Sequence, residues 1–175
     1  MIIVEGPDLA GKTTLCERIL EHMHRHGYPY VPRHLSRLPY CFLWQHYYNL
    51  ISPFVVQDRF HLSEIPYAKV RGDVPILDSW SYQIVDGWLK SVGAVQVVLI
   101  PTPEVLEARW RKDEMYTLEQ VQEVRANYLV MTNDRNVWYD AIYEVTDPDK
   151  GPNEEFIEDL CELAMKRHDY VESCS

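Results

Sequence analysis

A short segment near the start of the chain constrains its fold more than any other feature. The run Gly6-Pro7-Asp8-Leu9-Ala10-Gly11-Lys12-Thr13 matches the phosphate-binding pattern G-x-x-x-x-G-K-[ST] at every fixed position. Its glycines let the backbone curl so that successive N–H groups face a phosphate. A helix that starts there also turns its positive end toward the anion. The segment therefore predicts a P-loop.

The residues around this segment have the order that a true P-loop requires. Ile2, Ile3 and Val4 form an apolar run typical of a buried strand. After the loop, apolar residues recur every fourth position from residue 15 to 23, which indicates a helix over residues 12–26. We expect Lys12 to reach the β- and γ-phosphates of ATP and Thr13 to place its hydroxyl on Mg²⁺. The predicted ATP-binding residues are Gly6, Pro7, Asp8, Leu9, Ala10, Gly11, Lys12, Thr13 and Thr14.

Strand and helix patterns alternate along the rest of the chain. Alternation of this kind implies crossover connections and a parallel sheet with helices on both faces. A length of 175 residues is typical of one domain. We therefore expect residues 1–175 to form a single α/β domain, a three-layer P-loop NTPase fold with a five-stranded parallel sheet. The predicted strands are residues 2–4, 28–31, 53–57, 95–100 and 141–145, and the predicted helices are 12–26, 39–51, 61–68, 79–90, 103–112, 117–131 and 153–167.

The charge balance narrows the classes of partner. The chain has 17 Lys and Arg against 27 Asp and Glu, a net charge of -10. An acidic chain attracts neither polymeric nucleic acid nor anionic lipid, so nucleic acid is an unlikely partner. No apolar run approaches the roughly 20 residues that span a bilayer, and the first residues lack the charged and apolar regions typical of a secretory signal. Four cysteines without metal-binding spacing indicate reduced thiols and a cytoplasmic location.

Two motifs resemble thymidylate kinases. Residues 5–14, Glu-Gly-Pro-Asp-Leu-Ala-Gly-Lys-Thr-Thr, are similar to the E-G-x-D-x-x-G-K-[ST]-T loop of that family, and Asp58-Arg59-Phe60 is similar to its Asp-Arg-aromatic motif. The extension of the second motif to Glu64 looks most like the compact thymidylate kinase-like proteins of bacteriophages. The resemblance implies Mg²⁺-dependent phosphoryl transfer from ATP to a deoxynucleoside monophosphate, dTMP or a modified pyrimidine analogue. It also implies small-molecule nucleotide substrates and a possible homodimer.

The resemblance implies roles for residues near the transferred phosphoryl group. Arg59 is expected to clamp the 5′-phosphate of the acceptor, because a guanidinium matches phosphate with two parallel hydrogen bonds. Asp58 would hold a Mg²⁺-bound water or orient Arg59. Asp8 would accept a hydrogen bond from a 3′-hydroxyl or serve the Mg²⁺ shell. The predicted metal residues are thus Thr13, Asp8 and Asp58.

The densest basic cluster of the sequence is Arg109-Trp-Arg111-Lys112. In the family that the chain resembles, a mobile LID lies at this point, so we expect a LID at about residues 108–118. Arg109 and Arg111 would close over ATP and supply positive charge in the transition state. One group of the family carries its catalytic arginine inside the P-loop, but Leu9 stands at that position here. Catalysis therefore depends on the LID arginines together with Lys12 and Arg59.

The base-binding residues are less sharply indicated than the phosphate-binding ones. Family members stack the base on an aromatic ring of the helix after the second strand, which suggests Phe42 in the predicted helix 39–51. Arg33, after the predicted second strand, would serve the base or the phosphate. Tyr67 and Arg71 would complete the acceptor pocket.

Three other functions compete with a nucleoside monophosphate kinase. The first is a deoxynucleoside kinase in which Asp58 acts as base toward a 5′-hydroxyl. The second is a kinase that acts on a modified base within DNA, which the acidic charge disfavours. The third is a nucleotide-binding module without catalysis.

Overall fold

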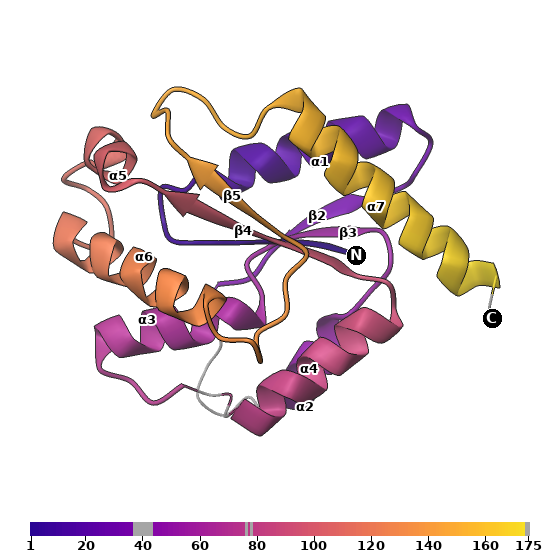
Figure 1. Cartoon of the computed structure of the whole chain (residues 1–175), viewed down its shortest axis with the longest axis horizontal. Helices are drawn as coiled ribbons and strands as arrows, with labels where there is room; N and C mark the ends of the chain where they lie inside the picture. The colour runs from indigo at the N-terminus through magenta and orange to yellow at the C-terminus, as the bar shows by residue number, and fades with distance from the viewer. Residues whose placement is uncertain (37–43, 76, 78, 174–175) are drawn as a thin grey trace.

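The computed structural model describes residues 1–36, 44–75, 77 and 79–173. Its centre is a five-stranded sheet with the strand order β2-β3-β1-β4-β5 (Figure 1). Every pair of neighbouring strands is parallel. The predicted α/β architecture, a parallel sheet flanked by helices, is therefore confirmed. The strands are β1 (Ile2–Glu5), β2 (Val31–His34), β3 (Val55–Asp58), β4 (Val95–Pro101) and β5 (Ala141–Val145).

Helices cover both faces of the sheet (Figure 1). Helices α1 and α7 pack on one face, and α2, α3, α4 and α6 pack on the other. No helix among the described residues is long and apolar enough to cross a membrane. The helices are α1 (Lys12–Arg25), α2 (Trp44–Leu50), the 3₁₀ turn η1 (His61–Ser63), α3 (Glu64–Arg71), α4 (Ser79–Ser91), α5 (Pro103–Arg109), α6 (Leu118–Thr132) and α7 (Glu154–Ser173).

The burial of the sheet on both faces explains why its central strands are continuously apolar. Ile2 and Val4 of β1 enter the core under α1 and α7, whereas Ile3 enters the core under α2, α3, α4 and α6. In β4, Val97 and Val98 divide between the two cores in the same way. Successive side chains of a strand point to opposite faces, so a strand covered on both sides needs apolar residues at every position.

The prediction for the second strand was wrong in position. The structure begins β2 at Val31, so residues 28–30 of the expected strand lie outside it. Tyr30 is instead a buried side chain that packs edge-on against the ring of Phe54. Among the described strands, β2 is at the end of the order beside β3, so it is an edge strand and tolerates Pro32, which has no N–H to donate.

The helix after β4 also ends earlier than its sequence pattern predicts. Its start is well defined, since Thr102 caps it by accepting a hydrogen bond from the amide of Val105. Trp110, however, has an extended backbone and ends the helix at Arg109. The next helix, α6, begins after Thr117 with the predicted capping box to Gln120. Residues 110–117 therefore form a loop at the carboxyl end of the sheet.

Candidate phosphate and acceptor site

The backbone between β1 and α1 has the curl that the P-loop motif predicts. Gly6 has a positive φ of 141°, and a Cβ built there would lie 2.4 Å from the carbonyl oxygen of Leu99. Gly11 has φ 87° and directly precedes the first residue of α1. Leu9 also takes the left-handed conformation, at φ 63°. These conformations turn the loop so that the start of α1 faces its concave side.

Lys12 lies inside this loop rather than in solvent. Its side chain is buried, and Nζ donates a hydrogen bond of 2.6 Å to the carbonyl oxygen of Pro7. Burial, with a smaller contribution from Arg59, lowers the pKa of Lys12 to about 8. A bound phosphate would replace the Pro7 carbonyl with a charged acceptor and so favour the protonated amine.

Thr13 and Asp58 meet where β3 ends beside the P-loop. The hydroxyl of Thr13 donates a 2.8 Å hydrogen bond to Oδ2 of Asp58. Nδ1 of His34, at the end of β2, lies 3.3 Å from the same oxygen. The other oxygen, Oδ1, is buried and has no hydrogen-bond partner among the described residues. A buried carboxylate oxygen without a hydrogen-bond partner lowers the stability of the protein unless a ligand bonds to it.

The oxygens of Thr13 and Asp58 are ligands of the kind that Mg²⁺ prefers. Within residues 1–36, 44–75, 77 and 79–173, no group of three or more His, Cys, Asp and Glu could hold a metal by itself. This fits the usual Mg²⁺ arrangement, in which one or two protein oxygens act together with phosphate oxygens and water. The third predicted metal residue, Asp8, is instead paired with Arg59.

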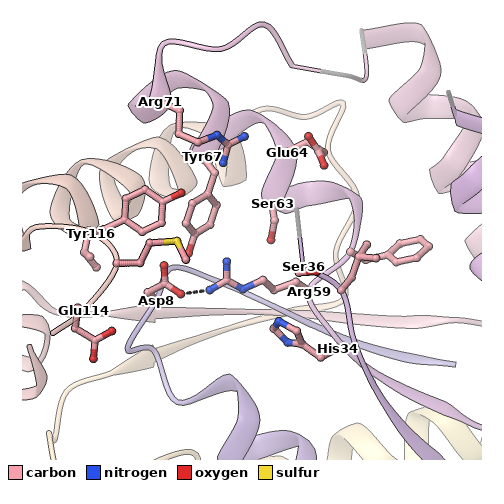
Figure 2. A pocket seen from close by; sticks show the side chains of 14 residues that line it. Asp8, His34, Ser36, Arg59, Ser63, Glu64, Tyr67, Arg71, Glu114 and Tyr116 are labelled. Carbon is pink, nitrogen blue, oxygen red and sulfur yellow. Dashed lines mark hydrogen bonds and ion pairs between the residues drawn. The ribbon is translucent and has the colours of Figure 1, made fainter. Parts of the chain in front are cut away.

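Arg59 lies at the first residue after β3, in a left-handed conformation with φ 65°. Its amide donates to the carbonyl of Val4, and its own carbonyl accepts from Nε2 of Gln57 at 2.9 Å. The guanidinium forms an ion pair with Asp8 of the P-loop (Figure 2). Its Cζ also lies 4.7 Å from the centre of the Tyr67 ring. Such a strained backbone persists only where the surroundings hold it, as they do here.

Two adjoining cavities open at this end of the sheet. The phosphate cavity has a volume of about 310 Å³ and is lined by the P-loop, His34, Asp58 and Arg59. The outer cavity has a volume of about 550 Å³. Asp8, His34 and Arg59 line both, so the outer cavity begins where the phosphate cavity ends.

Helix α3 supplies one wall of the outer cavity, with Glu64, Tyr67 and Arg71 (Figure 2). Tyr67 is buried, and burial raises the pKa of its hydroxyl well above the ordinary value. Nε of Arg71 donates a 2.6 Å hydrogen bond to Asp73. The structure thus places the predicted acceptor residues Tyr67 and Arg71 together with Arg59.

The loop 110–117 forms another part of this wall, which the sequence did not predict. Glu114, Met115 and Tyr116 line the outer cavity (Figure 2). Of the two predicted LID arginines, Arg109 reaches the P-loop, where Nη1 donates to the carbonyl of Leu9 at 2.9 Å. Arg111 is exposed and donates to the carbonyl of Ala108 at 3.0 Å.

Of the two predicted base-binding residues, only Arg33 lies among the residues that the structure describes. Arg33 lies within β2, not after it, and its guanidinium donates to the carbonyl of Leu50 at the end of α2. It does not line either cavity. Phe42, the predicted stacking ring, lies outside the described residues. Tyr47 of the same aromatic helix is fully buried in the core.

The sequence prediction assigned no role to Glu5 or His34. Glu5, the last residue of β1, is fully buried, and its carboxylate accepts hydrogen bonds from the segment after Arg59. A carboxylate that ends an apolar strand was the available signal for Glu5. The signal for His34 was weaker, because its place at the strand end depends on the true start of β2.

Comparisons with known proteins concern the fold. No protein-family model and no curated protein matches the chain. Among solved structures, the YorR protein of Bacillus subtilis, in complex with phosphorylated GDP, has a TM-score of 0.74 at 25% identity, over 96% of this chain and 97% of that one. Deoxyadenosine kinase from M. mycoides with bound dATP has a TM-score of 0.50 at 17% identity, over 96% and 98%. Neither is described as a thymidylate kinase, so that resemblance stays a prediction. The chain has the fold of P-loop nucleotide kinases.

Proposed function

We propose that the chain is a Mg-ATP-dependent kinase that phosphorylates a deoxynucleoside monophosphate, dTMP or a modified pyrimidine analogue, to the diphosphate. The observation that carries this proposal is the place of Arg59. Its guanidinium lines both cavities, where an acceptor phosphate would meet the γ-phosphate of ATP. The relation to YorR and deoxyadenosine kinase supports nucleotide phosphorylation in general.

The residues can supply what phosphoryl transfer needs, which is positioning and neutralisation of charge. The P-loop amides and Lys12 would hold the β- and γ-phosphates. Arg59 would exchange its bond to Asp8 for one to the acceptor phosphate, and Asp8 would then be available to a 3′-hydroxyl. Arg109 already donates a hydrogen bond to the carbonyl of Leu9 in the P-loop, and it would add positive charge there. Mg²⁺, held through Thr13 and Asp58, supplies electrostatic stabilisation of the phosphates when bound.

A general base is not required for this acceptor. A phosphate monoester has its second pKa near 6, so its oxygens are ionised at neutral pH. The attacking oxygen therefore has no proton to lose, and Asp58 is left for the metal. This separates a monophosphate acceptor from a nucleoside, whose 5′-hydroxyl must be deprotonated.

The walls of the outer cavity offer a base one hydrogen-bond acceptor and one donor. Glu64 and Arg71 both line it, and both project from the same helix. A fixed pair of this kind distinguishes the order of groups on the edge of the base. Thymine, uracil and guanine share one order, a carbonyl beside an N–H, and adenine and cytosine share the opposite order, an amino group beside an acceptor nitrogen. The resemblance to thymidylate kinases leads us to propose the first order. We therefore extend the acceptor panel from pyrimidines to guanine nucleotides, which the complex of YorR with phosphorylated GDP also recommends.

A deoxynucleoside kinase is the second candidate. The contact of His34 with Asp58 between the two cavities favours it, because that carboxylate could accept the proton of a 5′-hydroxyl. The fold shared with deoxyadenosine kinase adds weight. Under this candidate Asp58→Asn abolishes turnover by loss of the base, and nucleosides replace monophosphates as acceptors.

Other elements of the prediction remain parts of the proposal. We propose that residues 1–175 act as one kinase domain, that residues 108–118 close as a LID, and that Arg111 joins Arg109 at ATP on closure. A homodimer and a cytoplasmic location belong to the same proposal.

The deciding experiment is an acceptor panel. The protein is incubated with Mg-ATP and with nucleosides, nucleoside monophosphates and oligonucleotides, and ADP and phosphorylated product are measured. We expect ADP release with dTMP, dUMP or dGMP above dCMP and dAMP. Turnover with nucleosides alone would favour the second candidate. Turnover with oligonucleotides alone would indicate a DNA kinase, and ATP binding without any turnover a non-catalytic module.

A further inference from the structure

Both carboxylate oxygens of Glu5 are bonded to protein groups near the site. It is fully buried at the end of β1, one residue before the P-loop begins. Oε1 accepts from the amides of Phe60 at 2.8 Å and Leu62 at 3.0 Å. Oε2 accepts from the hydroxyls of Ser63 at 2.5 Å and Tyr128 at 3.2 Å. Phe60 and Ser63 also line the outer cavity, but Glu5 lines neither cavity, so its carboxylate is directed at the protein and not at a ligand.

The two bonds of Oε1 hold the turn that projects Arg59. Phe60 directly follows the left-handed residue, so its amide fixes the plane of the Arg59–Phe60 peptide. Val4 accepts from the amide of Arg59, and Gln57 donates to its carbonyl. The amide of Arg59, its carbonyl and the amide of Phe60 are thereby bonded to Val4, Gln57 and Glu5. This enclosure lets a non-glycine residue keep φ 65°.

The two bonds of Oε2 extend the same anchor to α6. Tyr128 is fully buried on that helix, and its hydroxyl also lies 2.8 Å from Oγ of Ser63. Burial raises the pKa of Tyr128 well above its ordinary value, so the hydroxyl stays protonated and available to donate. Helix α6 follows the loop 110–117, which lines the outer cavity. One carboxylate thus joins the P-loop strand, the turn of Arg59 and the helix behind the loop.

We infer that Glu5 is a positioning residue for the acceptor phosphate: it fixes the turn of Arg59 so that the guanidinium enters the outer cavity. The inference rests on the proposed function, in which Arg59 binds that phosphate. Rigid support of a binding group matters because a displacement of about 1 Å in a reacting group can cost roughly 100-fold in rate.

The length of the Glu5 side chain, and not its negative charge, is the property that holds the turn of Arg59 in place. Glu5→Asp keeps the charge but withdraws both oxygens from the amides of Phe60 and Leu62. Glu5→Gln keeps the reach, since its amide oxygen can accept from both amides and its NH₂ can donate to the Ser63 and Tyr128 hydroxyls. We expect Glu5→Asp to lower kcat/KM for the acceptor by about 10- to 100-fold. Glu5→Gln should stay within about threefold of wild type, and the Kd of ATP should change little in both.

A double-mutant cycle with Arg59→Ala separates positioning from general destabilisation. If Glu5 acts through Arg59, Glu5→Asp costs little further activity once the guanidinium is gone. The matched control is Asp140→Asn, which removes a buried carboxylate from its pair with Arg167 at the other end of the sheet. Asp140→Asn should lower the melting temperature of the wild-type protein and of the Arg59→Ala variant. It should leave the KM of the acceptor unchanged in both.

The readouts also separate this inference from the proposed function. Hydrogen exchange at the amides of Phe60 and Leu62 needs no substrate, and Glu5→Asp should accelerate both while Glu5→Gln protects them. Wild-type protein that transfers no phosphoryl group would refute the proposed function, whereas normal amide protection in Glu5→Asp would refute the anchor. An equal loss in Glu5→Gln and Glu5→Asp would assign the effect to charge and overturn the inference. An undiminished cost of Glu5→Asp in the Arg59→Ala background would overturn it as well.

Discussion

The two cavities of the site are built in different ways. The phosphate cavity takes most of its lining from one contiguous segment, residues 8–14, whose backbone supplies the binding groups. The outer cavity collects side chains from the P-loop, from the end of β2, from the turn and helix after β3, and from the loop before α6. Under the proposed function, phosphate recognition would therefore depend on one local segment, whereas acceptor recognition would depend on tertiary structure. Mutations in the phosphate cavity and in the outer cavity should therefore affect ATP and the acceptor separately.

Lys12→Ala should have the largest effect. Loss of this buried amine removes the only cation within the P-loop and should lower kcat by about 10²- to 10³-fold, as loss of preorganised charge does elsewhere. Steady-state turnover with ATP and the best acceptor measures it. Lys166→Ala, which breaks only an exposed pair with Glu162 on α7, is the matched control and should leave kcat unchanged. Near-normal turnover of Lys12→Ala would contradict its assigned role.

Arg59→Ala tests whether acceptor binding can be weakened without a change in ATP binding. Loss of a charge-assisted bond to the acceptor phosphate should lower kcat/KM for the acceptor by about 10- to 100-fold. The Kd of ATP, measured by calorimetry, should change little, because the P-loop amides remain. Arg59→Lys should not restore activity, since an amine lacks the planar fork. A large loss of ATP affinity in Arg59→Ala would show that Arg59 serves ATP as well as the acceptor, which would contradict this separation.

The pKa of Lys12 predicts how pH acts on the phosphate cavity alone. With a pKa of about 8 in the free protein, Lys12 loses its proton above that pH, so ATP affinity should fall by up to about tenfold per pH unit, with proton uptake on binding near pH 8. Without ATP, the unfolded chain binds more protons between pH 8 and 10.5, so stability should rise with pH there. The difference in free energy of unfolding between the wild type and Lys12→Met should rise by about 3 kcal/mol at most over this pH range. A flat difference in free energy of unfolding would contradict the lowered pKa.

Arg71→Ala should have the smallest effect, confined to the outer cavity. It removes a donor from one wall but leaves Arg59 and the P-loop intact. The preference for dTMP or dGMP over dCMP and dAMP should fall by about tenfold or less, with kcat nearly unchanged. Competition between acceptors in one reaction measures the ratio directly. An unaltered ratio would place base recognition elsewhere in the cavity.

The difference between the cavities also explains what the sequence could predict. Gly6, Gly11 and Lys12 were identified because a contiguous segment dictates its own conformation. The strand β4 was identified because burial on both faces leaves a continuous apolar run. The start of β2 was misplaced because Tyr28 and Tyr30 have strand-like character but satisfy the core through packing, not through pairing. That shift carried Arg33 into the strand and His34 to its end.

The role of Glu5 needed the assembled molecule. Its partners lie on the turn after β3 and on α6, at sequence separations of 55 to 123 residues. No local pattern reports such contacts, since the motif shows only that an acidic residue precedes the glycine. A LID over ATP was predicted at about residues 108–118 because of Arg109 and Arg111, yet residues 114–116 of this stretch line the outer cavity.

The ion pair between Asp8 and Arg59 has a consequence for selectivity. An anion that enters the phosphate cavity must compete with a carboxylate already bound to the guanidinium of Arg59. Inorganic phosphate would bond to the guanidinium but leave Asp8 without its cation. A nucleotide can repay that loss, because its sugar hydroxyl can bond to the released Asp8. Under the proposed function, this exchange would favour a phosphate that carries a nucleoside over one that does not.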